Sequence, residues 1–188
     1  MKCSADSEKL LSLYETVNNW QQVQARSEEG VMSYDEYEEQ MDNYLNTLEE
    51  FEDIGVRKIG EGRDRITFTS GDIVSSPTTS IIKVSKSGGG SQNVEEVELW
   101  KQLDEKVRKN VAWLIDWDPK HRWIIQERVS QLSSPSATQA VLEKLEDKGW
   151  TCSDVRPENV GKRESTDNKK KRPKEPVLMD LGVGLRRI

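Results

Sequence analysis

The chain has 188 residues, of which 34% are hydrophobic and 33% charged, and its formal net charge is -6. This length supports one compact domain with an appendage, and six tryptophans supply bulky core residues, which argues against disorder throughout. No apolar stretch approaches the roughly 20 residues of a membrane span, and the N-terminus lacks the apolar run of a secretory signal. The two cysteines match neither a disulfide framework nor a metal site. We therefore expect a cytoplasmic protein with no membrane partner.

The charges are distributed unevenly along the chain. Residues 1–55 carry 14 acidic and 3 basic side chains, a net charge of -11, whereas residues 56–188 carry 20 acidic and 25 basic side chains, a net charge of +5. A solvated helix face explains such an acidic segment, and an interface with a basic surface is the alternative. We expect two domains, an acidic segment over 1–54 and a core over 55–188.

The acidic segment has the pattern of a helical hairpin. Apolar residues recur at helical spacing in two stretches, from Leu10 to Trp20 and from Tyr34 to Phe51. Gly30 is expected to end the first helix, and Ser33 with Glu36 has the form of a capping box at the start of the second. The apolar stripes need a partner surface, either the rest of the chain or another protein.

From Val56 onward, short β-rich runs replace the helical pattern. Strands are predicted at 56–59, 66–69, 80–84, 111–115 and 122–128, with helices beginning near Gln92 and spanning 137–148. Runs of this kind separated by Gly, Ser, Pro and Asp are typical of an antiparallel meander. The sequence therefore predicts an α+β fold with an antiparallel sheet and an N-terminal helical hairpin.

A glycine-containing turn joins the first two predicted strands. Gly60 and Gly62 lie in it, and glycine allows backbone amides to approach a polyphosphate because it has no side chain. A plain hairpin turn is the alternative interpretation of these two residues alone.

A lysine in an apolar strand and a glutamate on the next helix follow. Lys83 is costly among apolar neighbours unless it is paired, so it either reaches solvent from an edge strand or meets an acid and a phosphate. Glu96 is the expected acid, because its spacing to Leu103 places both on the inward face of the next helix. Glu95 and Glu98 fall on other faces, where solvent is expected.

Two aspartate-centred segments complete the pattern. Residues 154–159 read DVRPEN, and a predicted strand ends in Asp180-Leu181-Gly182. A turn rich in Asp and Asn is the structural alternative for the first segment. Taken in order, the glycine turn, the strand lysine, the helix glutamate and these two segments resemble the nucleotide site of the protein-kinase-like fold.

The resemblance implies roles for four polar residues. Asp154 would orient a substrate hydroxyl and accept its proton, and Arg156 stands where the family has a phosphate-contacting lysine. Asn159 and Asp180 would hold Mg²⁺ together with substrate phosphates. Arg156 keeps the positive charge that this role needs.

The resemblance also implies an ATP site. Gly60 and Gly62 would cover the phosphates, and Lys83 would contact them. The segment 123–129 resembles the strand and hinge on which the family docks adenine, through backbone groups near Glu127 and Val129. ATP and Mg²⁺ are therefore the expected cofactors.

The chain departs from the family pattern at several points. Arg65 replaces the third glycine of the phosphate loop, and Cys152-Ser153 replaces the usual His-Arg before the catalytic aspartate. The sequence also ends eight residues after Asp180, so the resemblance implies a minimal kinase-like core with a truncated C-lobe. Compact cores of this kind resemble small, divergent viral and microbial kinase-like proteins.

A basic tract separates Asn159 from Asp180. It contains seven basic residues, and the favoured interpretation is a solvated hairpin insertion, with contact to nucleic acid the less favoured one because no aromatic residue interleaves. These residues are Lys162, Arg163, Lys169, Lys170, Lys171, Arg172 and Lys174.

Two functions of different classes follow from the pattern. The favoured one is an ATP/Mg-dependent kinase-like phosphotransferase acting on serine or threonine of a protein substrate. The alternative is a catalytically weak pseudokinase that binds and regulates a host or partner protein through its acidic helical segment.

Overall fold

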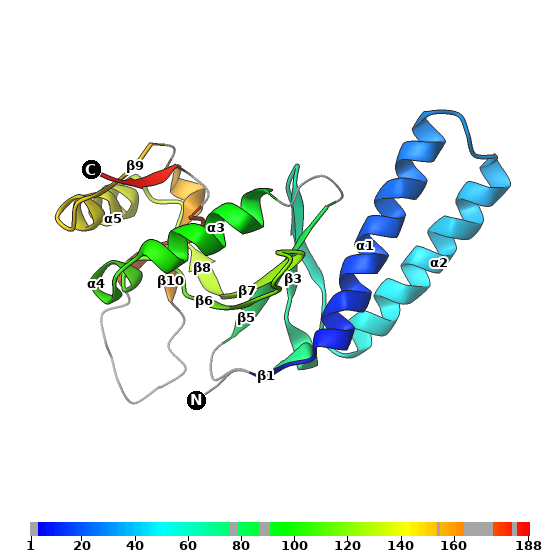
Figure 1. The fold of residues 1–188 in the computed structure, drawn as a ribbon, viewed down its shortest axis with the longest axis horizontal. Helices are drawn as coiled ribbons and strands as arrows, with labels where there is room; N and C mark the ends of the chain where they lie inside the picture. Colours follow the sequence, from blue (N-terminus) through cyan, green and yellow to red (C-terminus); the bar gives the residue numbers. More distant parts are fainter. Residues whose placement is uncertain (1–3, 76–78, 87–90, 154, 164–174, 182–183) are drawn as a thin grey trace. The chain divides into compact units, whose positions relative to one another are not determined.

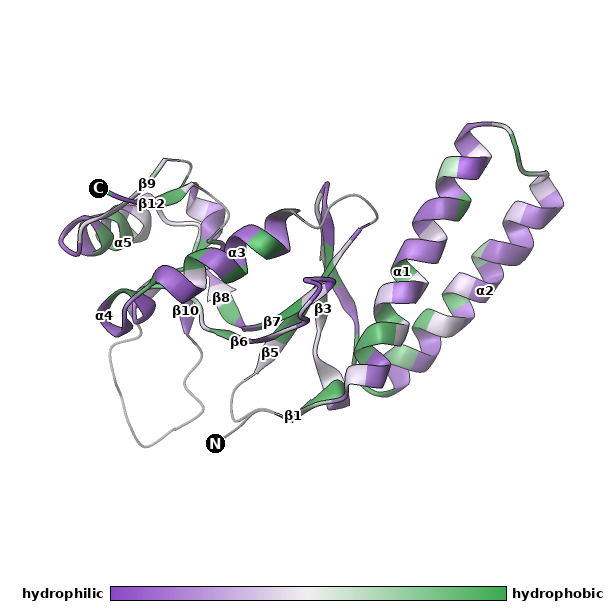
Figure 2. Cartoon of the chain, in the orientation of Figure 1, coloured by the Kyte–Doolittle hydropathy of each residue, from purple (hydrophilic) through white to green (hydrophobic). Residues whose placement is uncertain are grey.

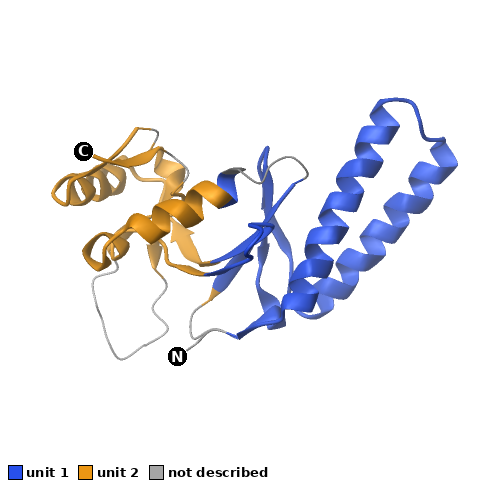
Figure 3. Ribbon diagram, viewed as in Figure 1, with its two compact units in different colours: residues 1–76, 80–93, 116–125 blue, residues 77–79, 94–115, 126–188 orange. Residues whose placement is uncertain are grey.

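The computed structural model describes residues 4–75, 79–86, 91–153, 155–163, 175–181 and 184–188. The chain divides into two compact units, coloured separately in Figure 3. Unit 1 holds residues 1–76, 80–93 and 116–125, and unit 2 holds residues 77–79, 94–115 and 126–188. Unit 1 thus combines the helical hairpin with the first strands, while the expected domains at 1–54 and 55–188 remain a prediction.

Two long helices form the N-terminal hairpin of unit 1 (Figure 1), α1 over Ser7–Glu28 and α2 over Tyr34–Asp53. Asp6 caps α1, because its Oδ1 accepts the Lys9 N–H at 3.1 Å, and Ser33 Oγ accepts the Glu36 N–H at 3.2 Å at the start of α2. Gly30 takes a φ of 70° after α1, a value that favours glycine. The expected hairpin, its break at Gly30 and its Ser33 cap are confirmed.

A five-stranded sheet follows the hairpin, in the order β2-β3-β5-β7-β6. Its strands are β2 (Lys58–Glu61), β3 (Arg65–Thr69), β5 (Ser80–Ser85), β7 (Trp123–Glu127) and β6 (Leu114–Trp117). β3 pairs with both β2 and β5 in antiparallel register. Helices and antiparallel strands occur together in the fold, so the α+β prediction is confirmed.

A 3₁₀ helix and two short paired strands lie next to the beginning of α1 in unit 1. The 3₁₀ helix η1 (Gly71–Ile73) leads into β4 (Val74–Ser75), which pairs with β1 (Ser4–Ala5) in antiparallel register. The Asp6 N–H donates to the Ile73 carbonyl at 2.9 Å and so fixes the beginning of α1.

The first strand lies later in the chain than the sequence predicts. We expected a strand over 56–59, but the Val56 N–H donates to the Phe51 carbonyl at 2.9 Å and continues the end of α2. β2 begins at Lys58, and Gly60 lies inside it, opposite Thr67. The turn itself begins at Gly62, whose N–H donates to the Arg65 carbonyl at 2.9 Å.

In its described residues, unit 2 contains three α-helices and two small antiparallel sheets. The sheets have the orders β11-β10-β8 and β12-β9. The helices are α3 (Ser91–Gln102), most of which lies in this unit, α4 (Glu105–Arg108) and α5 (Pro135–Glu146). The remaining elements are β8 (Val129–Gln131), β9 (Trp150–Cys152), η2 (Pro157–Asn159), β10 (Val160–Arg163), β11 (Pro176–Leu178) and β12 (Leu185–Arg187).

The core of unit 2 is built from apolar residues of most of these elements. α5 contributes Val141 and Leu145, which are fully buried, and β11 contributes Leu178. Burial of this kind is worth about 1.5–3 kcal/mol for each large aliphatic side chain. The core therefore supports β11 and the residues directly after it, among them Asp180. No helix among the described residues is long and apolar enough to cross a membrane.

Candidate functional site

The glycine turn of unit 1 is an exposed hairpin. Gly62 closes it through the backbone, and Glu61, just before the turn, forms ion pairs with Lys58 and with Lys86, the latter at 2.6 Å. Hydrogen bonds from these two lysines hold the pKa of the Glu61 carboxyl below its usual value. The strand before the turn is thus held at its end by side-chain charges. Contact of this turn with phosphate remains a prediction.

Lys83 lies in β5 of unit 1. It stands opposite Thr67 of β3, and only 6% of it is exposed. A lysine at such a position requires a negative or polar partner, because burial of an uncompensated charge is costly. Its expected partner Glu96 belongs to unit 2, so the pairing of these two residues remains a prediction.

Glu96 is buried in α3 of unit 2, with 1% of its surface exposed. Its Oε1 accepts the backbone N–H of Leu181 at 3.2 Å. Glu95 and Glu98 are exposed, so the predicted helix face is correct. The carboxylate of Glu96 therefore lies beside the residue that follows Asp180.

The two predicted metal ligands are brought together by strand pairing. β10 and β11 are antiparallel, with Val160 opposite Leu178, and the Met179 N–H donates to the Asn159 carbonyl at 2.7 Å beyond this pair. Asn159 and Asp180 consequently flank the end of the same pair of strands. This adjacency joins residues 21 positions apart in the sequence.

The donor set at this point suits magnesium. Mg²⁺ is usually held by one or two oxygen side chains together with phosphate oxygens and water, and Asn159 and Asp180 supply an amide oxygen and a carboxylate. Both residues are partly buried rather than sealed in the core. Among the described residues, no group of three or more His, Cys, Asp or Glu is placed to hold a metal.

The remaining residues of the 154–159 segment lie at the start of η2. Arg156 is exposed, and its carbonyl accepts the Asn159 N–H at 2.9 Å. Asp154, the expected base, and Gly182, of the second aspartate segment, lie outside the described residues. The roles of Asp154 and Arg156 therefore remain predictions.

Glu127 and Val129 lie at the junction of β7 and β8. The Glu127 N–H donates to the Trp113 carbonyl at 2.8 Å, and Val129 packs in a small apolar cluster with Ala112, Val177 and Met179. Val129 is thus near the strand end that positions Asn159 and Asp180. The docking of adenine on these backbone groups remains a prediction.

Arg163 is a structural residue that the sequence interpretation missed. We expected a solvated insertion from Lys162 onward, but Lys162 and Arg163 lie in β10, opposite Ser130 and Val129. The expectation is wrong for these two residues, because pairing with β8 holds them in a sheet. The rest of the tract, 164–174, lies outside the described residues.

Arg163 fixes the position of Glu127. Its Nε donates to both carboxylate oxygens of Glu127 at 3.0 Å, and its Nη1 and Nη2 donate to the carbonyls of Lys109 and Val111 at 2.7 and 2.6 Å. The guanidinium carbon also lies 5.3 Å from the ring centre of Trp113. Only 9% of the Glu127 side chain is exposed, so its carboxylate is largely desolvated and depends on Arg163 as its partner.

Gln126 is a second residue that the sequence interpretation missed. It is 2% exposed, and its Nε2 donates to the Met179 carbonyl at 2.9 Å. The segment 179–181 is therefore held from two sides, by Gln126 at Met179 and by Glu96 at Leu181. A buried amide that bonds to a distant backbone carbonyl leaves no pattern in the sequence.

No family model and no curated protein matches the chain. The solved structures that are similar to part of the chain include the kinase domain of PF14_0431 and WbdD. The kinase domain of PF14_0431 is 17% identical, with a TM-score of 0.49 over 70% of this chain and 50% of its own. WbdD, crystallised with the kinase inhibitor LY294002, is 13% identical, with a TM-score of 0.45 over 68% of this chain and 32% of its own. The chain spans about half the length of the first structure and about a third of the second. The kinase-like interpretation therefore depends on the residues of the chain itself.

Proposed function

We propose that the protein is an ATP- and magnesium-dependent, kinase-like phosphotransferase whose acceptor is a serine or threonine hydroxyl of a protein. The adjacency of Asn159 and Asp180, with Glu96 bonded to Leu181, is the observation that supports this proposal most strongly. Asn159, Asp180 and Glu96 thus contribute an amide, a carboxylate and a buried acid near the end of the β10–β11 pair. These are the residue types that phosphoryl transfer needs to position a metal and phosphates.

In this proposal each polar residue has a separate task. Bound Mg²⁺ would neutralise phosphate charge, and Asn159 and Asp180 would hold it. Lys83 and Arg156 would bind phosphate oxygens, and Asp154 would orient the acceptor hydroxyl and take its proton. Most of the rate enhancement in phosphoryl transfer comes from positioning and charge, so a small core can supply it.

Calorimetry with ATP, in the presence and absence of magnesium, tests this function. We expect magnesium to tighten binding by at least about tenfold, which corresponds to about 1.4 kcal/mol, and Asp180→Ala to abolish that gain. Asp147→Ala is the matched control, because Asp147 is exposed at the end of α5 in the same unit. A folded wild-type protein that binds no ATP would contradict the proposal.

The pseudokinase alternative has its own supporting observation. α2 carries nine acidic and no basic residues, and only Phe51 of this helix is buried. Such a helix carries two groups of acidic side chains, over 35–42 and 49–53, that a basic protein could bind. In this alternative the nucleotide site would have little or no catalytic role.

Asp154→Ala distinguishes the two functions. The enzyme proposal predicts loss of phosphoryl transfer while ATP binding persists, because the base does not hold the nucleotide. If the variant transfers phosphate as well as the wild type does, Asp154 is not the base. If neither protein transfers phosphate and both bind ATP equally, the alternative is favoured.

A further inference from the structure

A pocket of about 430 Å³ lies in unit 1, and none of its lining residues is among those assigned above to nucleotide binding. It is lined by the first turns of α1 and by the chain from the end of β6 to the beginning of β7. Two of its lining residues are Trp117 and Trp123, and Leu11 of α1 adds apolar surface. Its size is within the range of small-ligand sites, which is about 300–1,000 Å³.

One ion pair belongs to the wall of this pocket. Arg122 Nη2 and Nε donate to the two carboxylate oxygens of Asp118 at 2.8 and 2.9 Å, and the N–H groups of Lys120 and Arg122 donate to the same carboxylate. Hydrogen bonds from Arg122 hold the pKa of Asp118 below its usual value. The positive charge of Arg122 is therefore already neutralised within the wall.

Two further carboxylates, those of Glu8 and Asp116, line the pocket. Within the part of the chain that the structure describes, neither Glu8 nor Asp116 forms an ion pair. The Asp116 carboxylate accepts a hydrogen bond from the backbone N–H of Trp117 at 2.9 Å. With the Asp118–Arg122 pair balanced, the lining has an excess of two negative charges.

The helix N-terminus at this pocket does not reverse that charge. The first turn of a helix attracts anions, but Asp6 caps α1 and Glu8 lies in its first turn. Both carboxylates offset the partial positive charge of the helix end. The pocket thus combines negative charge with two indole rings.

We propose that this pocket binds an organic cation, an ammonium or guanidinium group carried on an apolar chain. Carboxylates attract the charge, and indole faces attract cations with energies of about 0.5–2 kcal/mol depending on desolvation. The apolar chain of the ligand would contact Leu11 and the tryptophan rings. The site takes no part in the proposed phosphoryl transfer.

Calorimetry with butylguanidinium and with butylurea, its uncharged analogue, tests this proposal. We expect the wild-type protein to bind butylguanidinium at least about tenfold more tightly than butylurea. The double variant Glu8→Gln, Asp116→Asn should lose this preference, whereas Glu28→Gln, at an exposed position in the last turn of α1, should keep it. Equal binding of the two compounds, or an unchanged preference in the double variant, would overturn the proposal.

A second measurement locates the ligand and identifies its source. The indole N–H signals of Trp117 and Trp123 should shift on titration in a nuclear magnetic resonance spectrum, and the assignments are made with Trp117→Phe and Trp123→Phe. Shifts confined to other tryptophans would contradict the proposed site. If N-acetylarginine methylamide binds more tightly than butylguanidinium, the natural cation is a protein side chain, and weaker binding indicates a free small cation.

Discussion

The two helices of the N-terminal hairpin have similar lengths and similar apolar patterns, but they are covered to very different extents. α1 fully buries Leu10, Leu13 and Val17, and it contacts β5 of the sheet. α2 buries only Phe51, close to its end, and leaves Leu45 47% exposed. Figure 2 shows the hydrophobic residues of both helices gathered at the base of the hairpin. A helical apolar stripe therefore predicts a helix without predicting how much of the stripe is covered.

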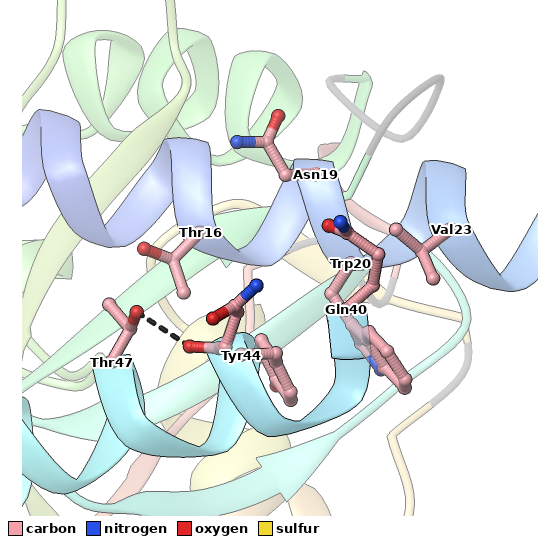
Figure 4. A pocket seen from close by; sticks show the side chains of 8 residues that line it. Thr16, Asn19, Trp20, Val23, Gln40, Tyr44 and Thr47 are labelled. Atoms are coloured by element: carbon pink, nitrogen blue, oxygen red, sulfur yellow. Dashed lines mark hydrogen bonds between the residues drawn. The ribbon is translucent and has the colours of Figure 1, made fainter. Parts of the chain in front are cut away.

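The contact between α1 and α2 is largely polar away from the base. A pocket of about 160 Å³ lies between them, lined mainly by amide and hydroxyl side chains (Figure 4). Its main apolar feature is the stacking of Trp20 on Tyr44, with ring centres 4.8 Å apart. The lining residues are Thr16, Asn19, Trp20, Val23, Gln40, Asn43, Tyr44 and Thr47. Along most of its length, α2 thus buries no side chain completely against α1.

The end of α2 is the part that the fold holds firmly. The Asp72 N–H donates to the Ile54 carbonyl at 2.8 Å. Gly71 lies so close that a Cβ added to it would stand 2.2 Å from that carbonyl oxygen, and its φ is 48°. Only glycine fits such an approach. α2 is consequently anchored at one end, whereas α1 is anchored along one face.

The largest expected effect comes from truncating the buried face of α1. Leu13→Ala should lower the free energy of unfolding by about 2–5 kcal/mol, because it leaves a cavity in a fully packed site. Leu45→Ala on α2 should cost less than about 1 kcal/mol, because nearly half of that side chain is already exposed. Denaturant unfolding of both variants measures the two losses of unfolding free energy. Equal losses would show that α2 is covered to the same extent as α1.

A smaller effect is expected at the ion pair beside α1. Arg122 bonds to Asp118, and its guanidinium carbon lies 5.7 Å from the ring centre of Tyr14 on α1. Asp118→Asn should therefore cost about 1.5–3 kcal/mol at pH 7, because it removes charge-assisted hydrogen bonds. Asp72→Asn, at an exposed position, is the control.

The same variant has a defined dependence on pH. The folded pKa of Asp118 is lowered, so its stabilising contribution is complete above the usual carboxyl value of about 3.9 and is lost as the pH falls through the folded value. The difference in stability between the wild type and Asp118→Asn should shrink on acidification from about pH 5 to pH 2. A constant difference across this range would exclude the ion pair as its cause.

Helices and one inward-facing site residue could be predicted from the sequence, because their signals are local. The Ser33 cap depends on residues three apart, and the face of Glu96 follows from helical periodicity. Arg163 could not be predicted, because its partner Glu127 is 36 residues away and a basic tract looks the same whether or not its first members enter a strand. The adjacency of Asn159 and Asp180 likewise depends on the pairing of β10 with β11.

Two asparagines, one on each helix, test the difference in anchoring between α1 and α2. Asn18 of α1 is 6% exposed, and its Nδ2 donates to the Ser85 carbonyl of β5 at 3.1 Å. Asn18→Ala should cost about 1–3 kcal/mol, because it leaves a buried carbonyl without this donor. Asn46→Ala, at an exposed position of α2, should cost less than about 0.5 kcal/mol. If thermal unfolding shows similar losses of stability for Asn18→Ala and Asn46→Ala, the hairpin is not anchored mainly through α1.

The smallest expected effect concerns the helix caps. Asp6→Ala and Ser33→Ala each remove one side-chain cap, worth about 1 kcal/mol. Because α1 is packed on the sheet, Asp6→Ala should lower the global stability by that amount. Because the beginning of α2 is little covered, Ser33→Ala should instead speed hydrogen exchange only in the first turns of α2, near Tyr37, and leave the exchange at Val17 unchanged. If Ser33→Ala speeds exchange at Val17 as well, α1 and α2 open together, and the hairpin must be regarded as one cooperative element.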